Sequence, residues 1–202
     1  FDGNTSDMSG NGNDGNITGT PNWVFSEGHH CINFDGNQYI ESLVPNFSQN
    51  FSYTFWAKPT DSHQIDAAST SGSGGLSGQR YILYPRNLLT TGSGVGASLG
   101  SNGVSIYEHR SGNIHSTATV AQHLSEWNFY TIVVSNNVAT LFINSVLTKN
   151  ALVTGKNLYR SAHISKGYEN DLGYKGYVDD FRFYNIAIPQ DVIDFLYATE
   201  QA

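Results

Sequence analysis

The sequence predicts an all-β domain, either a sandwich or a barrel, on three observations. Apolar and polar residues alternate over short runs, which is typical of half-buried strands. Turn residues (Gly, Asn, Asp, Ser and Pro) separate these runs at short intervals. A helical apolar period occurs only near the C-terminus, after Pro189. The 202 residues suit one domain of this type with a two-layer core.

The composition narrows the class of protein. Aromatic residues make up 13% of the chain and charged residues also 13%, about half the charged fraction of an average soluble protein. A disordered chain combines few aromatic residues with a high net charge, so we expect this chain to fold. Its net charge of −7 argues against a nucleic-acid partner, because phosphate contacts need clustered Lys and Arg. The charge is compatible with neutral ligands and with cations.

The sequence carries no feature of a membrane-spanning protein. No apolar run reaches the length of about 18 residues that a transmembrane helix needs, so we expect no membrane insertion. The single cysteine, Cys31, lies in an apolar stretch and is expected to be a buried thiol. The chain starts directly in turn residues, without a signal peptide. We therefore expect residues 1–202 to be one domain excised from a larger protein.

The first half of the chain predicts four strands, at 30–36, 39–44, 51–59 and 80–85. The third is the clearest, because Phe51, Tyr53 and Phe55 share one face at strict period two. Pro59 ends it, since proline donates no hydrogen bond to a sheet. Residues 60–79 are rich in Ser and Gly and too long for a plain hairpin connection, so we expect a functional loop there.

The second half predicts two hairpins, two single strands and a short helix, in the order 95–100 with 103–109, 127–135 with 138–149, 161–167, 176–184 and the residues after Pro189. The first hairpin turns around Ser101-Asn102-Gly103, because Asn-Gly is a strong hairpin signal. The second turns at Asn136-Asn137. Proline at the first turn of a helix, followed by apolar residues at helical spacing, predicts the helix.

The last predicted strand, GYVDDFRFY (176–184), interrupts strict alternation. Val178 and Phe181 are three residues apart, so they cannot share the core face of a regular strand. A β-bulge near Asp179-Asp180 adds one residue and reconciles them. Two adjacent carboxylates repel each other, and either Arg182 or a metal ion could supply the positive charge that they need.

These segments together resemble the laminin-G-like, concanavalin-A-like jelly-roll modules of bacterial secreted proteins. The resemblance is carried by FDGNTSDMSGNGNDG, INFDGNQYIE, FSYTFWAKP, EWNFYTIVV with ATLFINSVL, and GYVDDFRFYNIAIPQDVIDFLY, in that order. It implies a jelly-roll sandwich of two antiparallel sheets with one short C-terminal helix. It also implies an extracellular or cell-surface location, a glycan or other cell-surface ligand, and a multidomain or oligomeric parent protein. Residues 60–79 depart from the family pattern.

The same resemblance implies a structural calcium ion. Ca²⁺ prefers about six to eight oxygen ligands, and the opening segment offers Asp7, Asn11 and Asp14 on a glycine-rich backbone. The family topology brings this segment beside the last strand, where Asp179 would complete the site. The alternative is that the opening side chains form Asx-turns and that Asp179 pairs with Arg182.

Glycan binding needs planar hydrogen-bonding groups and an aromatic face, which YEHR (107–110) and neighbouring segments supply. The predicted ligand-binding residues are Arg80, Tyr81, Tyr84, Tyr107, Glu108, His109, Arg110 and Tyr168. The alternative is that Tyr107 and His109 pack against the sheet while the charged groups remain solvated.

We expect no catalysis. The hydrolases of the family carry carboxylates on one strand in a pattern such as E-x-D-x-E, and this sequence has none. A nucleophile elbow and zinc-ligand spacings are also missing. The leading hypothesis is a non-catalytic carbohydrate-binding module. A protein–protein adhesion or spacer domain is the alternative, and a polysaccharide lyase or glycosidase comes third.

Overall fold

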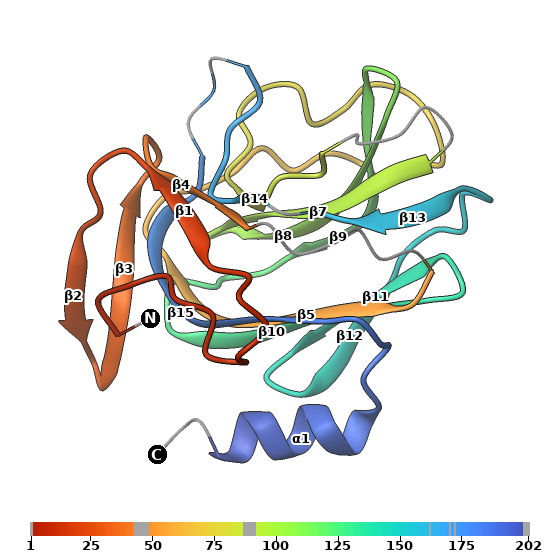
Figure 1. Ribbon diagram of the computed structural model, residues 1–202. Coiled ribbons are helices and arrows are strands. Elements are labelled where there is room, and N and C mark those ends of the chain that lie inside the picture. Colours follow the sequence, from red (N-terminus) through yellow and green to blue (C-terminus); the bar gives the residue numbers. More distant parts are fainter. Residues whose placement is uncertain are drawn as a thin grey trace.

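The computed structural model describes residues 2–42, 49–86, 92–161, 163–169, 171 and 173–199. Two sheets stack face to face, and one helix lies beneath the lower sheet (Figure 1). Neighbouring strands are antiparallel apart from one parallel pair at residues 157–160. The predicted all-β sandwich of two sheets with one short C-terminal helix is confirmed.

The upper sheet has eight strands, of which seven follow the order β1-β4-β14-β6-β7-β8-β9 and β13 pairs with β7. Their bounds are β1 (Gly15–Thr18), β4 (Tyr39–Ser42), β6 (Tyr81–Leu83), β7 (Gly92–Gly100), β8 (Gly103–Arg110), β9 (Asn113–Ala121), β13 (Asn157–Arg160) and β14 (His163–Ile164). Strands far apart in sequence thus become neighbours, which brings residues near 40, 84, 109 and 163 to one sheet.

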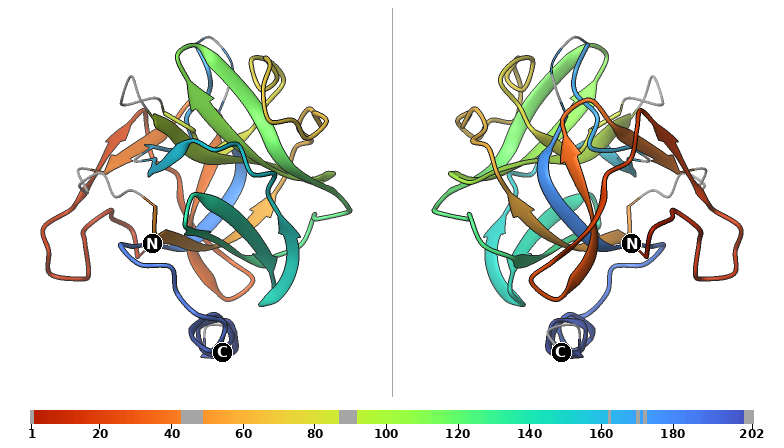
Figure 2. Two further views of the ribbon diagram at one scale, coloured as in Figure 1. Left: turned by 90° about the vertical axis from the view of Figure 1, so that its right-hand side faces the viewer. Right: turned by 90° about the vertical axis from the view of Figure 1, so that its left-hand side faces the viewer.

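The lower sheet has seven strands in the order β12-β11-β10-β5-β15-β3-β2. Their bounds are β2 (Trp23–Ser26), β3 (His29–Asp35), β5 (Phe51–Pro59), β10 (Asn128–Ser135), β11 (Val138–Ile143), β12 (Val146–Asn150) and β15 (Lys175–Tyr184). Helix α1 (Gln190–Thr199) covers the outer face of this sheet (Figure 2). It buries Ile193 and Leu196 beside Trp56, which is 5% exposed.

The core lies between the two sheets and follows from period two. Phe51, Tyr53 and Phe55 of β5 point inward and are at most 1% exposed, as their alternation predicts. From the upper sheet, Val104 and Ile106 of β8 meet the same cluster. Each fully buried side chain of this size contributes about 1.5–3 kcal/mol through the hydrophobic effect, so the facing sheets hold the sandwich together.

The hairpin turns use the residues that the sequence predicts. Asn136 and Asn137 join β10 to β11 with φ of 50° and 63°. Both residues are left-handed, as a two-residue turn between twisted strands requires. In the first hairpin the loop residues are Ser101 and Asn102, and Gly103 already pairs with Gly100 in the sheet.

The predicted bulge in the last strand is present. The pairing of β15 with β5 shifts register between Asp179 and Arg182, and Asp180 is left-handed with φ of 47°. Arg182 donates to both oxygens of Asp180, with Nε–Oδ1 of 2.9 Å and Nη2–Oδ2 of 2.6 Å. The positive neighbour of Asp180 is therefore Arg182, whereas Asp179 pairs with the Nδ1 atom of His29 at 3.1 Å.

Other expectations have mixed outcomes. Cys31 is a buried thiol as predicted, and burial raises its pKa to about 11. The predicted strand over 161–167 shortens to His163–Ile164, and residues 43, 44 and 162 of two predicted strands lie outside the described residues. In the part of the chain that the structure describes, no helix is long and apolar enough to cross a membrane.

Candidate functional site

The long loop over residues 60–79 packs against the outer face of the eight-stranded sheet. Its anchor is the Oδ2 atom of Asp66, which accepts hydrogen bonds from the Tyr107 hydroxyl (2.7 Å), the Gly75 amide (2.8 Å) and the Gln79 side-chain amide (3.0 Å). Gly75 has φ of +70°, and a Cβ atom there would lie 2.5 Å from the Tyr81 hydroxyl. Only glycine lets the loop approach the sheet this closely.

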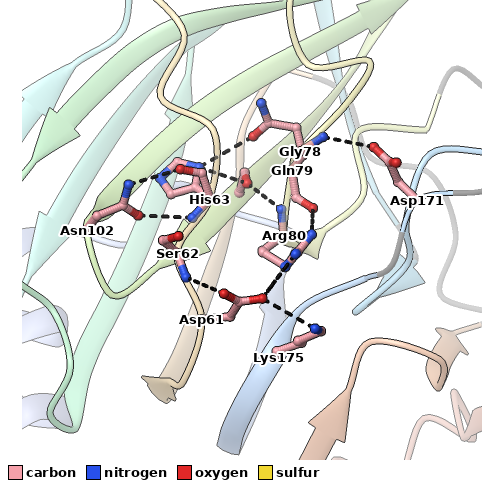
Figure 3. Close-up of polar contacts among 10 residues, drawn as sticks. Asp61, Ser62, His63, Gly78, Gln79, Arg80, Asn102, Asp171 and Lys175 are labelled. Carbon is pink, nitrogen blue, oxygen red and sulfur yellow. Dashed lines mark hydrogen bonds and ion pairs between the residues drawn. The ribbon is translucent and has the colours of Figure 1, made fainter.

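A polar network fixes both ends of this loop (Figure 3). At its start, Asp61 accepts from Arg80 Nε at 3.1 Å and lies 3.3 Å from Lys175 Nζ. Burial alone would raise the pKa of Asp61, but the hydrogen bonds and charges of Arg80 and Lys175 outweigh burial and lower it. At its end, the Gly78 amide donates to Asp171 at 3.0 Å. Arg80, one of the predicted ligand-binding residues, therefore helps to fasten the loop.

Five other predicted residues form one aromatic row on the same outer face. Tyr81 and Tyr107 are 0% exposed and form its floor, with ring centroids 5.4 Å apart. Tyr84, His109 and Tyr168 are part-exposed, and their rings follow one another at 6.0 Å and 6.4 Å. Burial is also the main reason that the pKa of Tyr84 rises to about 12. The hydroxyl of Tyr84 therefore stays protonated and can donate a hydrogen bond at neutral pH.

Polar groups from β4, from β14 and from the segment after β6 adjoin the row. Arg86 Nη1 lies 2.9 Å from Glu41 Oε1, and His163 Nε2 lies 3.1 Å from the same oxygen. The Tyr39 ring lies 6.1 Å from that of His163, and Lys166 Nζ sits 4.5 Å over the Tyr39 ring. Burial is the main reason that the pKa of His163 falls to about 4. We call the set comprising Tyr39, Glu41, Tyr84, Arg86, His109, His163 and Tyr168 the aromatic face.

The predicted site set misses the half of this face that comes from β4 and β14. Tyr39 and Glu41 alternate with Ile40, which is buried in the core, so the sequence does place both on one outer face. Their partner His163 lies 124 residues downstream of Tyr39 in the chain. The alternation in β4 could have identified Tyr39 and Glu41 as outward-facing residues. It could not have shown that β4 lies next to β14 in the sheet.

The remaining two predicted residues lie on the other side of β8. Alternation turns Glu108 away from Tyr107 and His109, and Glu108 is 2% exposed. Glu108 accepts from Thr154 Oγ1 at 2.8 Å and lies 3.7 Å from Lys156 Nζ. Burial raises the pKa of this carboxyl group. At the end of the strand, Arg110 lines a separate pocket of about 360 Å³.

The predicted calcium ligands do not converge in the structure. The opening loop does lie beside the last strand, and Asp7 and Asn11 line a groove of about 900 Å³ together with Asp180 and Arg182. However, Asp7 Oδ1 and Oδ2 each accept a backbone N–H at 2.9 Å. The Ser9 side chain, followed by these two backbone bonds, lowers the pKa of Asp7 to about 2.

Asp14 accepts the Asp7 amide at 2.7 Å, while Asp179 faces His29 rather than this groove. Among the described residues, no group of three or more His, Cys, Asp or Glu side chains is placed to hold a metal ion. The four predicted residues therefore do not fit one ion as they stand, and calcium binding stays a prediction.

Comparison with known proteins agrees with this architecture. A family model described as the concanavalin A-like lectin/glucanases superfamily matches residues 34–194. No curated protein sequence matches the chain. Among solved structures, the chain is similar to domain 4 of AbnA, a GH43 extracellular arabinanase from Geobacillus stearothermophilus, solved in complex with arabinotriose. That match has a TM-score of 0.66 and 20% identity, and covers 96% of this chain and 93% of that one.

Two toxin domains show the same likeness over part of their length. The binding domain of Paraclostridial Mosquitocidal Protein 1 matches with a TM-score of 0.64 and 18% identity, over 96% of this chain and 49% of that one. The binding domain of botulinum neurotoxin DC in complex with SialylT matches with a TM-score of 0.66 and 13% identity, over 96% and 48%. The chain thus spans about half of each toxin domain, and at these identities the likeness concerns the fold.

Proposed function

Because the chain belongs to the concanavalin A-like lectin/glucanase superfamily, we propose that it is a non-catalytic carbohydrate-binding domain. One observation carries the proposal: the aromatic face sets part-exposed rings directly beside planar charged groups. Sugar rings stack on aromatic side chains, and their hydroxyl groups pair with such planar groups. The solved complexes of similar folds with arabinotriose and with SialylT support this choice of ligand class.

The aromatic face is built to bind without rearrangement. Tyr84, His109 and Tyr168 would supply the stacking surface, and the buried Tyr81 and Tyr107 support them from below. The loop over residues 60–79, which Asp66 anchors, holds these two buried rings in place. A preorganised surface loses little conformational entropy on binding. A shallow face of this kind gives modest affinity, which several copies in one parent protein would raise through avidity.

The charged groups favour binding over bond cleavage. Glycoside hydrolysis uses two carboxyl groups about 5–9 Å apart, one of which must give up a proton. Glu41, the carboxylate of the aromatic face, is held by Arg86 and lies within hydrogen-bonding distance of His163. Its oxygens can accept hydrogen bonds from sugar hydroxyls. Glu41 is also the one carboxylate among the residues grouped as the aromatic face, whereas hydrolysis uses two.

The proposal includes a place outside the cell, as one domain of a larger protein. Two findings support this: the arabinanase is extracellular, and the chain corresponds to single domains or half-domains of the similar structures. A protein–protein adhesion or spacer role is the second candidate. The observation that favours it is the exposure of Val146, Leu147 and Val153, by 66%, 55% and 68%, on and just after the edge strand β12.

A glycan array tests the proposal. The domain should bind a selective set of glycans, and Tyr84→Ala should weaken that binding roughly tenfold, because loss of one stacked ring costs about 1–1.5 kcal/mol. Tyr177→Ala is the matched control, since Tyr177 is also part-exposed but lies on β15 of the other sheet. An array without hits, or equal losses in the two variants, would refute the proposed function.

A further inference from the structure

A second recessed site lies where three segments meet at one end of the eight-stranded sheet. The tip of the long loop (70–72), the β8–β9 turn (110–113) and Lys156 line the pocket of about 360 Å³. The β8–β9 hairpin and the long loop both project away from α1 (Figure 2). Since β8 alternates, this pocket is separate from the aromatic face, although the same strand contributes to both.

The charge of this pocket is opposite to that of the whole chain. The chain has ten Lys and Arg residues and a net charge of −7, yet Arg110 and Lys156 both line this small pocket. Among the described lining residues there is no carboxylate. The nearest acid, Glu108, is buried beneath, accepts from Thr154 and lies 3.7 Å from Lys156 Nζ. Glu108 therefore offsets part of the charge of Lys156, and Arg110 is the main cation of the pocket. Arg110 is exposed and has no ion-pair partner in the described part of the chain, so its guanidinium is available.

His115 adds a buried donor without an acceptor. Lys156 Nζ lies 2.9 Å from His115 Nε2, and an ammonium group can only donate, so Nε2 must be the acceptor. Burial, then the charge of Lys156, lowers the pKa of His115 to about 4. The ring is therefore neutral at pH 7 and carries its proton on Nδ1. This Nδ1 is buried and has no hydrogen-bond partner among the described residues, which is a costly arrangement.

The other lining groups also include donors. The hydroxyls of Thr70 and Ser71 and the side-chain amide of Asn113 border the same space. The set therefore offers a fork-shaped cation, a point cation and several neutral donors. Such a set recognises oxygen anions, because guanidinium and ammonium groups make charge-assisted hydrogen bonds to carboxylate or sulfate oxygens.

We propose that this pocket binds the anionic group of an acidic sugar, either the carboxylate of a uronic acid or a sulfate ester. The sugar part of the inference rests on the proposed function, since it gives the ligand class of the same domain. The anion part rests on the pocket alone. An acidic glycan would then contact Arg110 and Lys156, while neutral glycans would use only the aromatic face.

The test is a two-dimensional amide NMR titration at pH 7 and constant ionic strength, with D-glucuronate, D-glucose and sulfate as separate probes. We expect glucuronate or sulfate to shift amides of residues 70–72, 110–113 and 154–156 in a saturable way, and glucose to leave them unchanged. Sulfate binding without glucuronate binding would assign the pocket to sulfated sugars, and the reverse result to uronic acids.

Two single variants make the test specific. Arg110→Gln should weaken anion binding roughly tenfold, as expected for the loss of one charge-assisted contact. Lys149→Gln removes another exposed cation, on β12, and should leave anion binding unchanged. The pocket assignment is overturned if neither anion shifts these amide signals more than glucose does. It is also overturned if the two variants weaken anion binding by the same factor.

The two proposals fail in distinguishable ways. If the glycan array shows no hits but glucuronate still shifts these amides, the proposed function fails and the anion pocket stands. If neutral glycans bind and depend on Tyr84 while the anions leave the pocket unchanged, the pocket assignment fails and the proposed function stands.

Discussion

Removal of the Asp66 carboxylate should loosen the long loop and destabilise the whole domain. In Asp66→Ala, three donors lose their shared acceptor, namely the Tyr107 hydroxyl, the Gly75 amide and the Gln79 amide. A hydrogen bond to a charged group contributes about 1.5–3 kcal/mol, and a buried donor left unpaired costs about 1–3 kcal/mol.

The expected loss follows from the burial of each donor. Tyr107 is 0% exposed, so its hydroxyl bears a full penalty of about 2 kcal/mol. Asp66 is part-exposed, which lets water reach the freed amides once the loop moves, so we assign about 0.5 kcal/mol to each of them. The free energy of unfolding should therefore fall by about 3 kcal/mol, a large share of the stability of a domain.

Urea denaturation followed by tryptophan fluorescence measures this change, with the midpoint shifted and the slope unchanged. Asp2→Ala is the control, because Asp2 is exposed and, among the described residues, only its backbone carbonyl accepts a hydrogen bond; surface changes of this kind stay within about 0.5 kcal/mol. If Asp66→Ala loses less than about 1 kcal/mol, or no more than the control, the loop is not held as described.

Three further predictions concern pH, calcium and a glycine. Stability should fall as pH drops from 6.5 to about 4, because the pKa values of His115 and His163 fall from 6.5 to about 4 on folding. In this range the unfolded chain therefore binds more protons than the folded chain. In urea denaturation at several pH values, the free energy of unfolding of His115→Asn should depend less on pH than that of the unchanged protein. If the opening loop binds calcium as the resemblance implies, EDTA should lower the melting temperature, because a bound ion stabilises the folded state by mass action; an unchanged melting temperature with EDTA and with added Ca²⁺ would rule this ion out. Gly94→Ala should abolish glycan binding on the array, whereas Gly3→Ala, with no atom within 4 Å of its added methyl group, should not.

Local patterns in the sequence were sufficient for much of the fold. Period two located β5 with its observed ends, and the interrupted alternation around Asp179 located the bulge. The patterns did not find β1, β2, β9 or β13, which are short, edge-lying or polar, as in NIHSTATVA of β9. In such strands much of the burial comes from loops and neighbouring sheets, so the residues themselves carry little apolar alternation.

The candidate site was only half predictable for a related reason. The aromatic residues near 84 and 107 were found because each segment contains its own rings. Their grouping with Glu41 and His163 depends on the order β4-β14-β6 in the sheet, and a strand's sequence specifies its faces without naming its neighbours. The same alternation did separate Tyr107 and His109 from Glu108 and Arg110, so the residues of one predicted cluster lie on two separate sides of β8 in the structure.

The aromatic face also depends on residues that have no side chain. Strand β7 begins GSGVGASLG, a composition that favours a flexible loop, yet all nine residues form one buried strand. Gly92, Gly94 and Gly96 leave the first part of its outer face without Cβ atoms. A Cβ atom at Gly94 would lie 1.9 Å from the Arg86 carbonyl oxygen, and one at Gly96 would lie 2.2 Å from that of Leu83.

The backbone of residues 83–86 therefore rests directly on the sheet, and this contact holds Tyr84 and Arg86 at the centre of the aromatic face. A methyl group at Gly94 meets main-chain atoms that no side-chain rotation can move away. The crossing segment must then shift, and Tyr84 and Arg86 must shift with it. Because the added methyl group points to the outer face of β7, away from Val95 and Ala97 in the core, binding should respond to this substitution more strongly than stability does. That difference separates the role of these glycines in the site from their role in folding.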